Sequence, residues 1–323
     1  MSRSRDRSIA KELEAWFTVH ARDLPWRTEV RDGYQALVAE AMLQQTQVSR
    51  VVEKYEPFLE RFPTALALAE ADEDAVLASW SGLGYYRRAR NLHAAAKQIV
   101  ADHGGEVPSE PDRLLELKGV GRYTAGAIAS IAYNIRAPIV DGNVERVTLR
   151  LEGEALQAGS KEASDLAWER AETLVDVSKQ PGVFNEGLME LGATVCTPRG
   201  PRCGQCPLKR HCRARTAGAQ EEIPQPKARA KQKELFISVA VIRDGLGNTL
   251  VRQRPLDGLW GGLWEPISLE SSKSVPELGE LAQTIGVDEK ILSESDAFTH
   301  VTTHRLVRFL VFEGVVDRQS GLL

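Results

Sequence analysis

The spacing of the hydrophobic residues changes near residue 235, and this change predicts two parts with different secondary structure. In the first part apolar residues recur every three or four positions, which is the spacing of one face of an α-helix. Ile9, Leu13, Trp16 and Phe17 form the first such set. We therefore predict an all-helical part, with helices over 34–52, 87–103, 144–151, 163–177 and 185–194.

The second part has short apolar runs, which indicate strands. Residues 236–243 and 249–252 flank a glycine-containing loop and predict a hairpin, and residues 306–312 predict a closing strand. One helix is expected over 276–285. We therefore predict a smaller α+β domain over 235–323. A helical domain over 1–215 precedes it, and a linker over 216–234, rich in Ala, Gln, Pro and Lys, joins the two.

Composition adds bounds on compartment and partners. A chain of 323 residues with 42% hydrophobic and 27% charged residues is typical of a globular protein with two domains. It has no apolar run of membrane-spanning length, and its basic N-terminus lacks the apolar core of a signal peptide. We expect a cytoplasmic monomer without a membrane partner. The net charge is −4, but basic residues gather between Arg199 and Arg215 without an acid, which favours a phosphate-bearing partner.

The stretch 114–143 carries the first candidate site. Gly119-Val120-Gly121 follows a short apolar helix and precedes a helix rich in small residues. Glycine permits a tight turn, and the free amides at the start of the next helix attract anions such as a nucleic-acid phosphate. A plain helical hairpin with glycine caps explains the same pattern. Asp141 follows at a predicted helix start, where Asp is also a preferred N-cap.

Two carboxyl groups have opposite predicted environments. Glu40 sits among apolar residues of its predicted helix, so desolvation should raise its pKa toward neutrality. Asp141 lies at a helix start, where the dipole favours the charged form. A protonated and a charged carboxyl are the pair that glycosidic bond cleavage uses. The alternative for Glu40 is an ordinary surface glutamate.

All four cysteines of the chain fall in one basic loop, which does not resemble a disulfide framework. They are Cys196, Cys203, Cys206 and Cys212. Four thiolates at such spacing suit either a tetrahedral zinc ion or an iron–sulfur cluster. Either group would organise a loop that carries six Arg or Lys residues.

Together, the hairpin followed by Asp141, the Glu40–Gln47 stretch and the cysteine loop resemble the helix-hairpin-helix DNA glycosylases, and in particular the adenine glycosylase (MutY) family. The resemblance implies a helical glycosylase domain with a [4Fe–4S] loop over 196–212, followed by a Nudix-like domain. It implies removal of adenine mispaired with 8-oxoguanine or guanine in double-stranded DNA.

The resemblance also implies a role for each candidate residue. Glu40 becomes the general acid and Asp141 the stabiliser of the sugar cation or a transient nucleophile, with Tyr123 and Asn143 beside them. The four cysteines hold the cluster. The remaining candidates are Arg27 and Glu186 at the adenine pocket; Gln45, Tyr85, Lys118, Gly119 and Gly121 at the DNA; and Thr299 and His300 in a loop that reads 8-oxoguanine.

Rival functions remain within the same fold. An endonuclease III-type enzyme uses a lysine Schiff base, and that lysine would fall at Tyr123, so we expect a monofunctional glycosylase; nearby Lys118 leaves room for weak lyase activity. The third hypothesis, after the adenine glycosylase and the endonuclease III-type enzyme, is a module that binds damaged DNA without catalysis. Gln283 and Thr284 replace the glutamate pair of a true Nudix hydrolase, so we expect no pyrophosphatase activity. The Nudix-like domain is expected to be abbreviated at its C-terminus.

Overall fold

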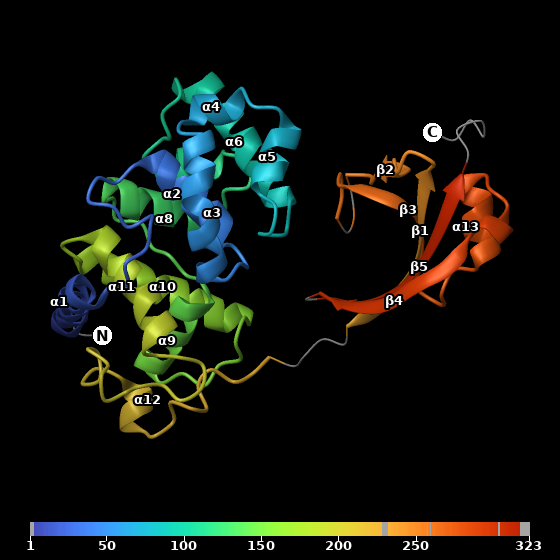
Figure 1. Cartoon of the computed structure of the whole chain (residues 1–323). Coiled ribbons are helices and arrows are strands. Elements are labelled where there is room, and N and C mark those ends of the chain that lie inside the picture. Colours follow the sequence, from blue (N-terminus) through green and yellow to red (C-terminus); the bar gives the residue numbers. More distant parts are fainter. Residues whose placement is uncertain (1–2, 228–231, 257, 259, 303, 317–323) are drawn as a thin grey trace. The chain divides into compact units, whose positions relative to one another are not determined.

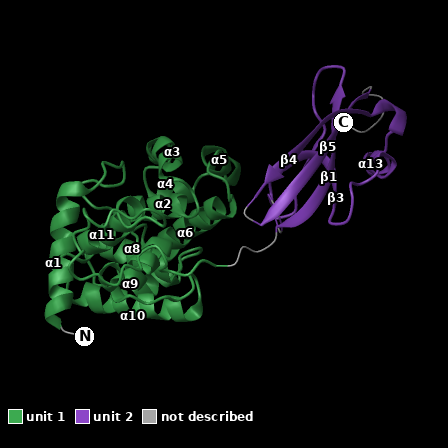
Figure 2. Ribbon diagram, turned by 90° about the horizontal axis from the view of Figure 1, so that it is seen from below, with its two compact units in different colours: residues 1–227 green, residues 228–323 purple. Residues whose placement is uncertain are grey.

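The computed structural model describes residues 3–227, 232–256, 258, 260–302 and 304–316. The chain divides into unit 1, Met1–Lys227, and unit 2, Ala228–Leu323 (Figures 1 and 2). None of the helices in the described part of the chain combines the length and apolar composition that crossing a bilayer requires.

Unit 1 is built from helices joined by loops, the longest of which carries the cysteines between α11 and α12 (Figure 1). They are α1 (Arg3–His20), α2 (Gly33–Leu43), α3 (Val48–Arg61), α4 (Ala65–Ala69), α5 (Glu73–Ser79), α6 (Arg87–His103), α7 (Pro111–Leu115), α8 (Arg122–Tyr133), α9 (Gly142–Glu152), α10 (Lys161–Val177), α11 (Pro181–Thr194) and α12 (Arg213–Thr216). The predicted all-helical character and the helix 87–103 are confirmed.

Two large hydrophobic cores hold most of these helices together, and a smaller cluster around Leu149 and Ala214 holds α12 against α9. One large core lies among α2 to α8, around Trp80, Tyr55 and Phe58. The other joins α1 to α9, α10 and α11, around Leu13 and Phe184. The segment that leads from α8 to α9 therefore passes from one core to the other, and Asp141 stands near its end.

The single helix predicted over 34–52 is wrong. It is split into α2 and α3, because the backbone turns away at Gln44 to Gln47 and Gln45 adopts a φ of +55°. No Gly or Pro marks this break in the sequence. The main-chain carbonyls at the end of α2 are instead bound by Arg88, from a helix far along the chain.

Unit 2 is a five-stranded mixed sheet in the order β2-β3-β1-β5-β4, with α13 (Leu278–Ile285) packed on one face. The long strands β1 (Lys233–Asp244) and β5 (Arg305–Val316) are parallel, and the other pairs are antiparallel. Both were predicted, as was α13. Residues 249–252 were predicted to form a hairpin with 236–243, but β2 (Val251–Gln253) pairs with β3, and the hairpin is limited to an isolated bridge between Arg243 and Thr249. The sequence missed β3 (Trp264–Ser271) and β4 (Ser293–Val301). All nine residues of β4 are exposed, so the strand lacks the alternation of apolar and polar residues from which a strand is predicted.

Gly126 lets helix α8 pack against the segment that leads to Asp141. A Cβ atom there would lie 2.2 Å from the carbonyl oxygen of Pro138. The obstructing atom belongs to the main chain, so no side-chain rotation can relieve the clash. The close contact therefore helps to fix where α9 begins.

Gly126→Ala should destabilise unit 1 by about 1–3 kcal/mol, the usual cost of overpacking a well-packed site. Urea unfolding followed by circular dichroism at the helix band measures it. Gly142→Ala is the matched control, because its Cβ would meet no atom within 4 Å. Equal midpoints for the two variants would contradict the close packing.

Candidate active site

A cavity of about 240 Å³ opens in unit 1 between the two cores. The loop before α2, α2 itself, the start of α8, the start of α9 and one face of α11 all contribute to its wall. Residues that the sequence singled out separately meet there: Arg27, Glu40, Tyr123, Asp141, Asn143 and Glu186 all line it. The two predicted carboxyls thus share one cavity.

Glu40 is buried in α2, with 6% of its surface exposed. Burial, and to a smaller extent the nearby charges of Asp141 and Glu186, raise the pKa of its carboxyl to about 7, although a hydrogen bond with Tyr123 acts in the opposite direction. Near neutral pH the carboxyl therefore carries a proton in much of the population. The desolvation predicted from its apolar neighbours is confirmed.

Asp141 is the N-cap of α9, as predicted. One of its carboxylate oxygens accepts the main-chain N–H of Val144 at 2.7 Å, and the other accepts the side-chain amide of Asn143 at 3.0 Å. Asn143 is held in turn, since its carbonyl oxygen accepts from Arg146 Nη2 at 2.8 Å. Two donors and the positive end of a helix suit a negative charge at this position.

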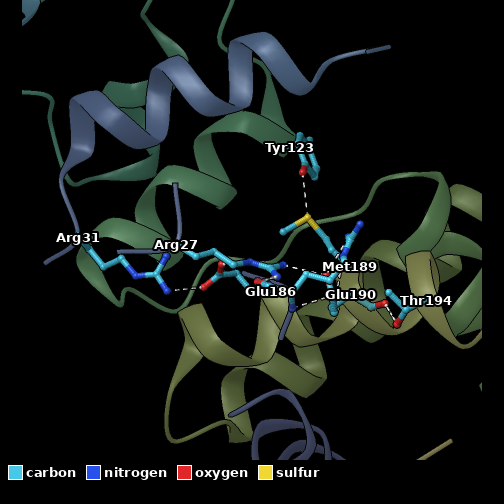
Figure 3. Close-up of polar contacts among 8 residues, drawn as sticks. Arg27, Arg31, Tyr123, Glu186, Met189, Glu190 and Thr194 are labelled. Atoms are coloured by element: carbon cyan, nitrogen blue, oxygen red, sulfur yellow. Dashed lines mark hydrogen bonds and ion pairs between the residues drawn. The ribbon is translucent and has the colours of Figure 1, made fainter. Parts of the chain in front are cut away.

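Tyr123 and Met189 form the part of the cavity wall near the two carboxyls and α11. The Tyr123 hydroxyl lies 3.1 Å from the sulfur of Met189 (Figure 3). It is also hydrogen-bonded with Glu40. Burial, followed by the charges of Glu40 and Asp141, raises the pKa of this phenol well above its ordinary value. The hydroxyl therefore stays protonated and can donate.

An ion-pair network forms another part of the wall. Arg27 contacts Glu186 at 3.2 Å and Glu190 at 3.0 Å, and Arg31 contacts Glu186 at 2.9 Å (Figure 3). Arg22 binds Glu190 at 2.7 Å. Burial alone would raise the pKa of Glu190, but the hydrogen bonds and charges of Arg22 and Arg27 lower it.

The sequence interpretation missed Arg22, Arg31 and Glu190. A signal for Glu190 existed, because Glu186 and Glu190 are four residues apart on an otherwise apolar helix and so share a face. One donor of this network is unused: among the described residues, the buried Nη1 of Arg31 has no hydrogen-bond partner. Since Arg31 lines the cavity, a bound molecule can supply the missing acceptor.

The predicted hairpin is present between α7 and α8. Gly119 adopts a φ of +80°, in the region that favours glycine, and Gly121 is the extended N-cap of α8. Lys118 is exposed, and its main-chain N–H donates to Gln98. Gln45 and Tyr85, the other DNA candidates, lie in two loops outside the cavity wall, and Tyr85 is 49% exposed.

The four cysteines line a separate small cavity with Arg150, Lys209 and Arg215. Arg150 Nη1 lies 3.4 Å from the sulfur of Cys196, and the thiol of Cys212 donates to the Arg150 carbonyl. Burial, and to a smaller extent the other three sulfurs, raise the pKa of Cys206 to about 12. In the described residues no three His, Cys, Asp or Glu side chains converge closely enough to hold one metal ion.

Comparison with known proteins gives the relatives of this arrangement. Residues 38–173 match the HhH-GPD superfamily base excision DNA repair protein family, and residues 238–321 match the NUDIX domain. The adenine DNA glycosylase of Mycolicibacterium smegmatis is 46% identical over 207 residues, covering 64% of this chain and 69% of that protein. The chain belongs to the adenine DNA glycosylase family. This confirms the resemblance carried by its motifs.

Other comparisons give a further relative from the adenine DNA glycosylase family and a solved structure with a similar fold. The human adenine DNA glycosylase is 44% identical over 219 residues; the match covers 65% of this chain, and the chain spans 40% of the human protein. The structure of a thermostable thymine-DNA glycosylase superposes with a TM-score of 0.60 at 29% identity, over 66% of this chain and 98% of that one. The expected fold class, a helix-hairpin-helix domain followed by a Nudix-like domain, is confirmed.

One expectation taken from the adenine DNA glycosylase family differs in unit 2. Thr299 and His300 were expected in a loop, but both lie within the edge strand β4. Register explains the placement, because Phe298, Thr299 and His300 pair in succession with Phe309, Arg308 and Val307 of β5. The Phe298 and Phe309 rings stack at 4.8 Å, and Trp260 lies 6.1 Å from His300. The two candidates are thus exposed beside aromatic rings.

The arrangement around Glu40 predicts two pKa changes of opposite sign. Tyr123→Phe should raise the pKa of Glu40 further, because it removes the hydrogen bond that lowers it. Asp141→Asn should lower the same pKa, because it removes a charge that raises it.

Carbon-13 NMR titration of protein labelled at the glutamate carboxyl measures both changes, with Glu40→Gln identifying the resonance. Glu53→Gln, on the exposed face of α3, is the control and should leave the Glu40 titration in place. Shifts of the same sign in both test variants would contradict the assigned contacts.

Proposed function

We propose that this chain is a base excision repair glycosylase that removes adenine mispaired with 8-oxoguanine or guanine in duplex DNA. The observation that carries the proposal is one cavity lined by a carboxyl with a pKa near 7, Glu40, and by a second carboxyl, Asp141, held at a helix start. Membership of the adenine DNA glycosylase family supports it.

Glu40 acts as the general acid. Adenine is a poor leaving group, and protonation of a ring nitrogen lets it depart with the electrons of the glycosidic bond. An acid with a pKa near the working pH is suited to this transfer, because it holds its proton and still releases it. Tyr123 orients the Glu40 carboxyl through their hydrogen bond.

Asp141 acts on the sugar. Loss of adenine leaves positive charge on the deoxyribose, and a carboxylate stabilises it directly or by transient bond formation before water completes the hydrolysis. Asn143 fixes the carboxylate plane through its amide. The phenol of Tyr123 forms no imine with the product sugar, so the reaction ends at an abasic site without strand cleavage.

The adenine has to leave the duplex to reach this cavity, which costs a few kcal/mol. Arg27, Arg31 and Glu186 then form the pocket for the extruded base, and the unused Nη1 donor of Arg31 supplies a hydrogen bond to it. Gln45 and Tyr85 serve as wedges, meaning side chains that fill the gap in the stack.

The remaining contacts hold the duplex. Amides at Gly119 and Gly121, with the exposed Lys118, bind a backbone phosphate at the start of α8. Thr299 and His300 of unit 2 contact the opposite base through a hydroxyl and an imidazole. Their exposure on β4, beside Trp260 and Phe298, supports a role in stacking against a base.

The cysteine loop holds a [4Fe–4S] cluster in this proposal. Four thiols around one small cavity supply the number and type of ligands that such a cluster needs. When bound, the cluster supplies structural order, since base removal moves no electron. Arg150 then neutralises part of the thiolate charge and ties the loop to α9.

Glu40→Gln and Asp141→Asn should each lower the single-turnover rate of adenine release by about 10²- to 10⁴-fold, because each removes one half of the chemistry. The wild-type rate should fall as the pH rises through about 7, since deprotonated Glu40 has no proton to give. The assay is a duplex with adenine opposite 8-oxoguanine, followed by hot alkali.

Binding to the same duplex should persist in both variants, and Glu53→Gln should keep the wild-type rate. Strand breaks that appear without alkali would instead indicate a lyase, and binding without any product would indicate a damage-binding module. Full turnover in either test variant would refute the role assigned to that carboxyl.

The cluster is tested by composition and absorbance. Purified protein should be brown, absorb near about 400 nm and contain about four irons per chain. Cys203→Ser should lose this absorbance, because one corner of the cluster loses its thiolate ligand. Stoichiometric zinc in colourless protein would contradict the assignment.

A further inference from the structure

Gln45 and Tyr85 share an uncommon backbone conformation. In the part of the chain that the structure describes, four non-glycine residues have positive φ, and these two are among them, at +55° and +48°. The left-handed region is strained for residues with a Cβ atom and persists where surrounding contacts impose it. Contacts from the surrounding structure must therefore hold the backbone of the two loops that carry Gln45 and Tyr85 in this conformation.

One guanidinium reaches both loops. Arg88, near the start of α6, donates through Nη1 to the end of α2. Through Nη2 it donates both to Thr46, in the loop after α2, and to the loop around Tyr85. Its acceptors are the carbonyls of Ala41 at 3.0 Å, Met42 at 2.9 Å and Gln44, the Thr46 hydroxyl at 2.9 Å, and the carbonyls of Leu83 at 3.0 Å and Gly84 at 3.1 Å.

Aromatic rings complete the surroundings of Arg88. Its guanidinium lies 5.4 Å from the Trp80 ring and 5.6 Å from the Tyr85 ring. Burial lowers the pKa of Arg88 to about 10, so it keeps its charge at neutral pH. These hydrogen bonds require a planar guanidinium with N–H donors on both Nη1 and Nη2, which the ammonium of lysine cannot reproduce.

We propose that Arg88 is a positioning residue for base extrusion, which fixes Gln45 and Tyr85 in the left-handed conformations that present both side chains to the duplex. The inference rests on the proposed function, because it takes these two residues as the wedges. It differs from simple capping of α2, in which Arg88 would serve only the helix that carries Glu40.

The experiment compares Arg88→Lys with Arg136→Lys. Arg136 also donates to main-chain carbonyls, those of Asp176 and Ser178, but lies away from both loops, so it is a matched control. The first readout is the fluorescence of 2-aminopurine placed as the target base opposite 8-oxoguanine, which rises when the base leaves the stack. Wild type and Arg136→Lys should give the full rise, and Arg88→Lys about a third of it or less.

The second readout separates extrusion from catalysis. On a fully paired duplex with adenine opposite 8-oxoguanine, Arg88→Lys should excise about ten-fold more slowly than wild type. On a duplex whose neighbouring pairs are mismatched, the target is already unstacked, and the deficit should shrink to about three-fold or less. Thr46→Val removes one acceptor of Nη2 and should change both readouts in the same direction, which keeps the test open if Arg88→Lys folds poorly.

An equal deficit on both duplexes would overturn the inference and indicate that Arg88 acts on Glu40 through α2. A full fluorescence rise in Arg88→Lys, or none in wild type, would also overturn it. A wild-type protein that extrudes 2-aminopurine but releases no adenine would refute the proposed function, while the fluorescence comparison still decides the role of Arg88.

Discussion

The candidate site depends on keeping water away from one carboxyl. Glu40 is buried in α2 beside two further acids, Asp141 and Glu186, and each contribution disfavours its charge. Asp141 has different surroundings, because it lies at a helix start and its carboxylate oxygens accept from two N–H donors. Two groups of the same chemical type thus have different environments, and the chemistry proposed for the cavity follows from that difference.

Helix α9 connects this difference to the cysteine loop. Asp141 caps its first turn, and Arg146 follows on the next turn, where Nη2 binds Asn143 and the Gly192 carbonyl while Nε binds the Cys196 carbonyl at 2.9 Å. Arg150, one turn further, contacts Cys196 again. The position of Asp141 therefore depends on how well the loop is ordered, even though none of the four cysteines lines the cavity.

Features that depend on residues nearby in the sequence could be predicted, whereas features that depend on contacts between distant residues could not. The raised pKa of Glu40 follows from the apolar residues of its own helix, and the cap at Asp141 follows from its place before α9. The break between α2 and α3 could not be read locally, because the partner of its carbonyls is Arg88, more than forty positions away. Arg31 was missed for the same reason, because its ion-pair partner, Glu186, lies on α11, far away in the sequence. Strand β4 lacked a hydrophobic pattern altogether, and pairing with β5 alone defines it.

The break after α2 has two consequences that belong together. Ending the helix at Leu43 places Glu40 in its last turn, within reach of Tyr123 from α8, and it frees the next residues to form an exposed loop. The same guanidinium that binds the freed carbonyls also binds the loop at Gly84. The acid is therefore buried in the cavity wall, while the left-handed residues Gln45 and Tyr85 are exposed to solvent. A continuous helix over 34–52 would have no loop at Gln45, so the residues proposed to open the stack and the residue proposed to cleave the bond could not stand on the same segment.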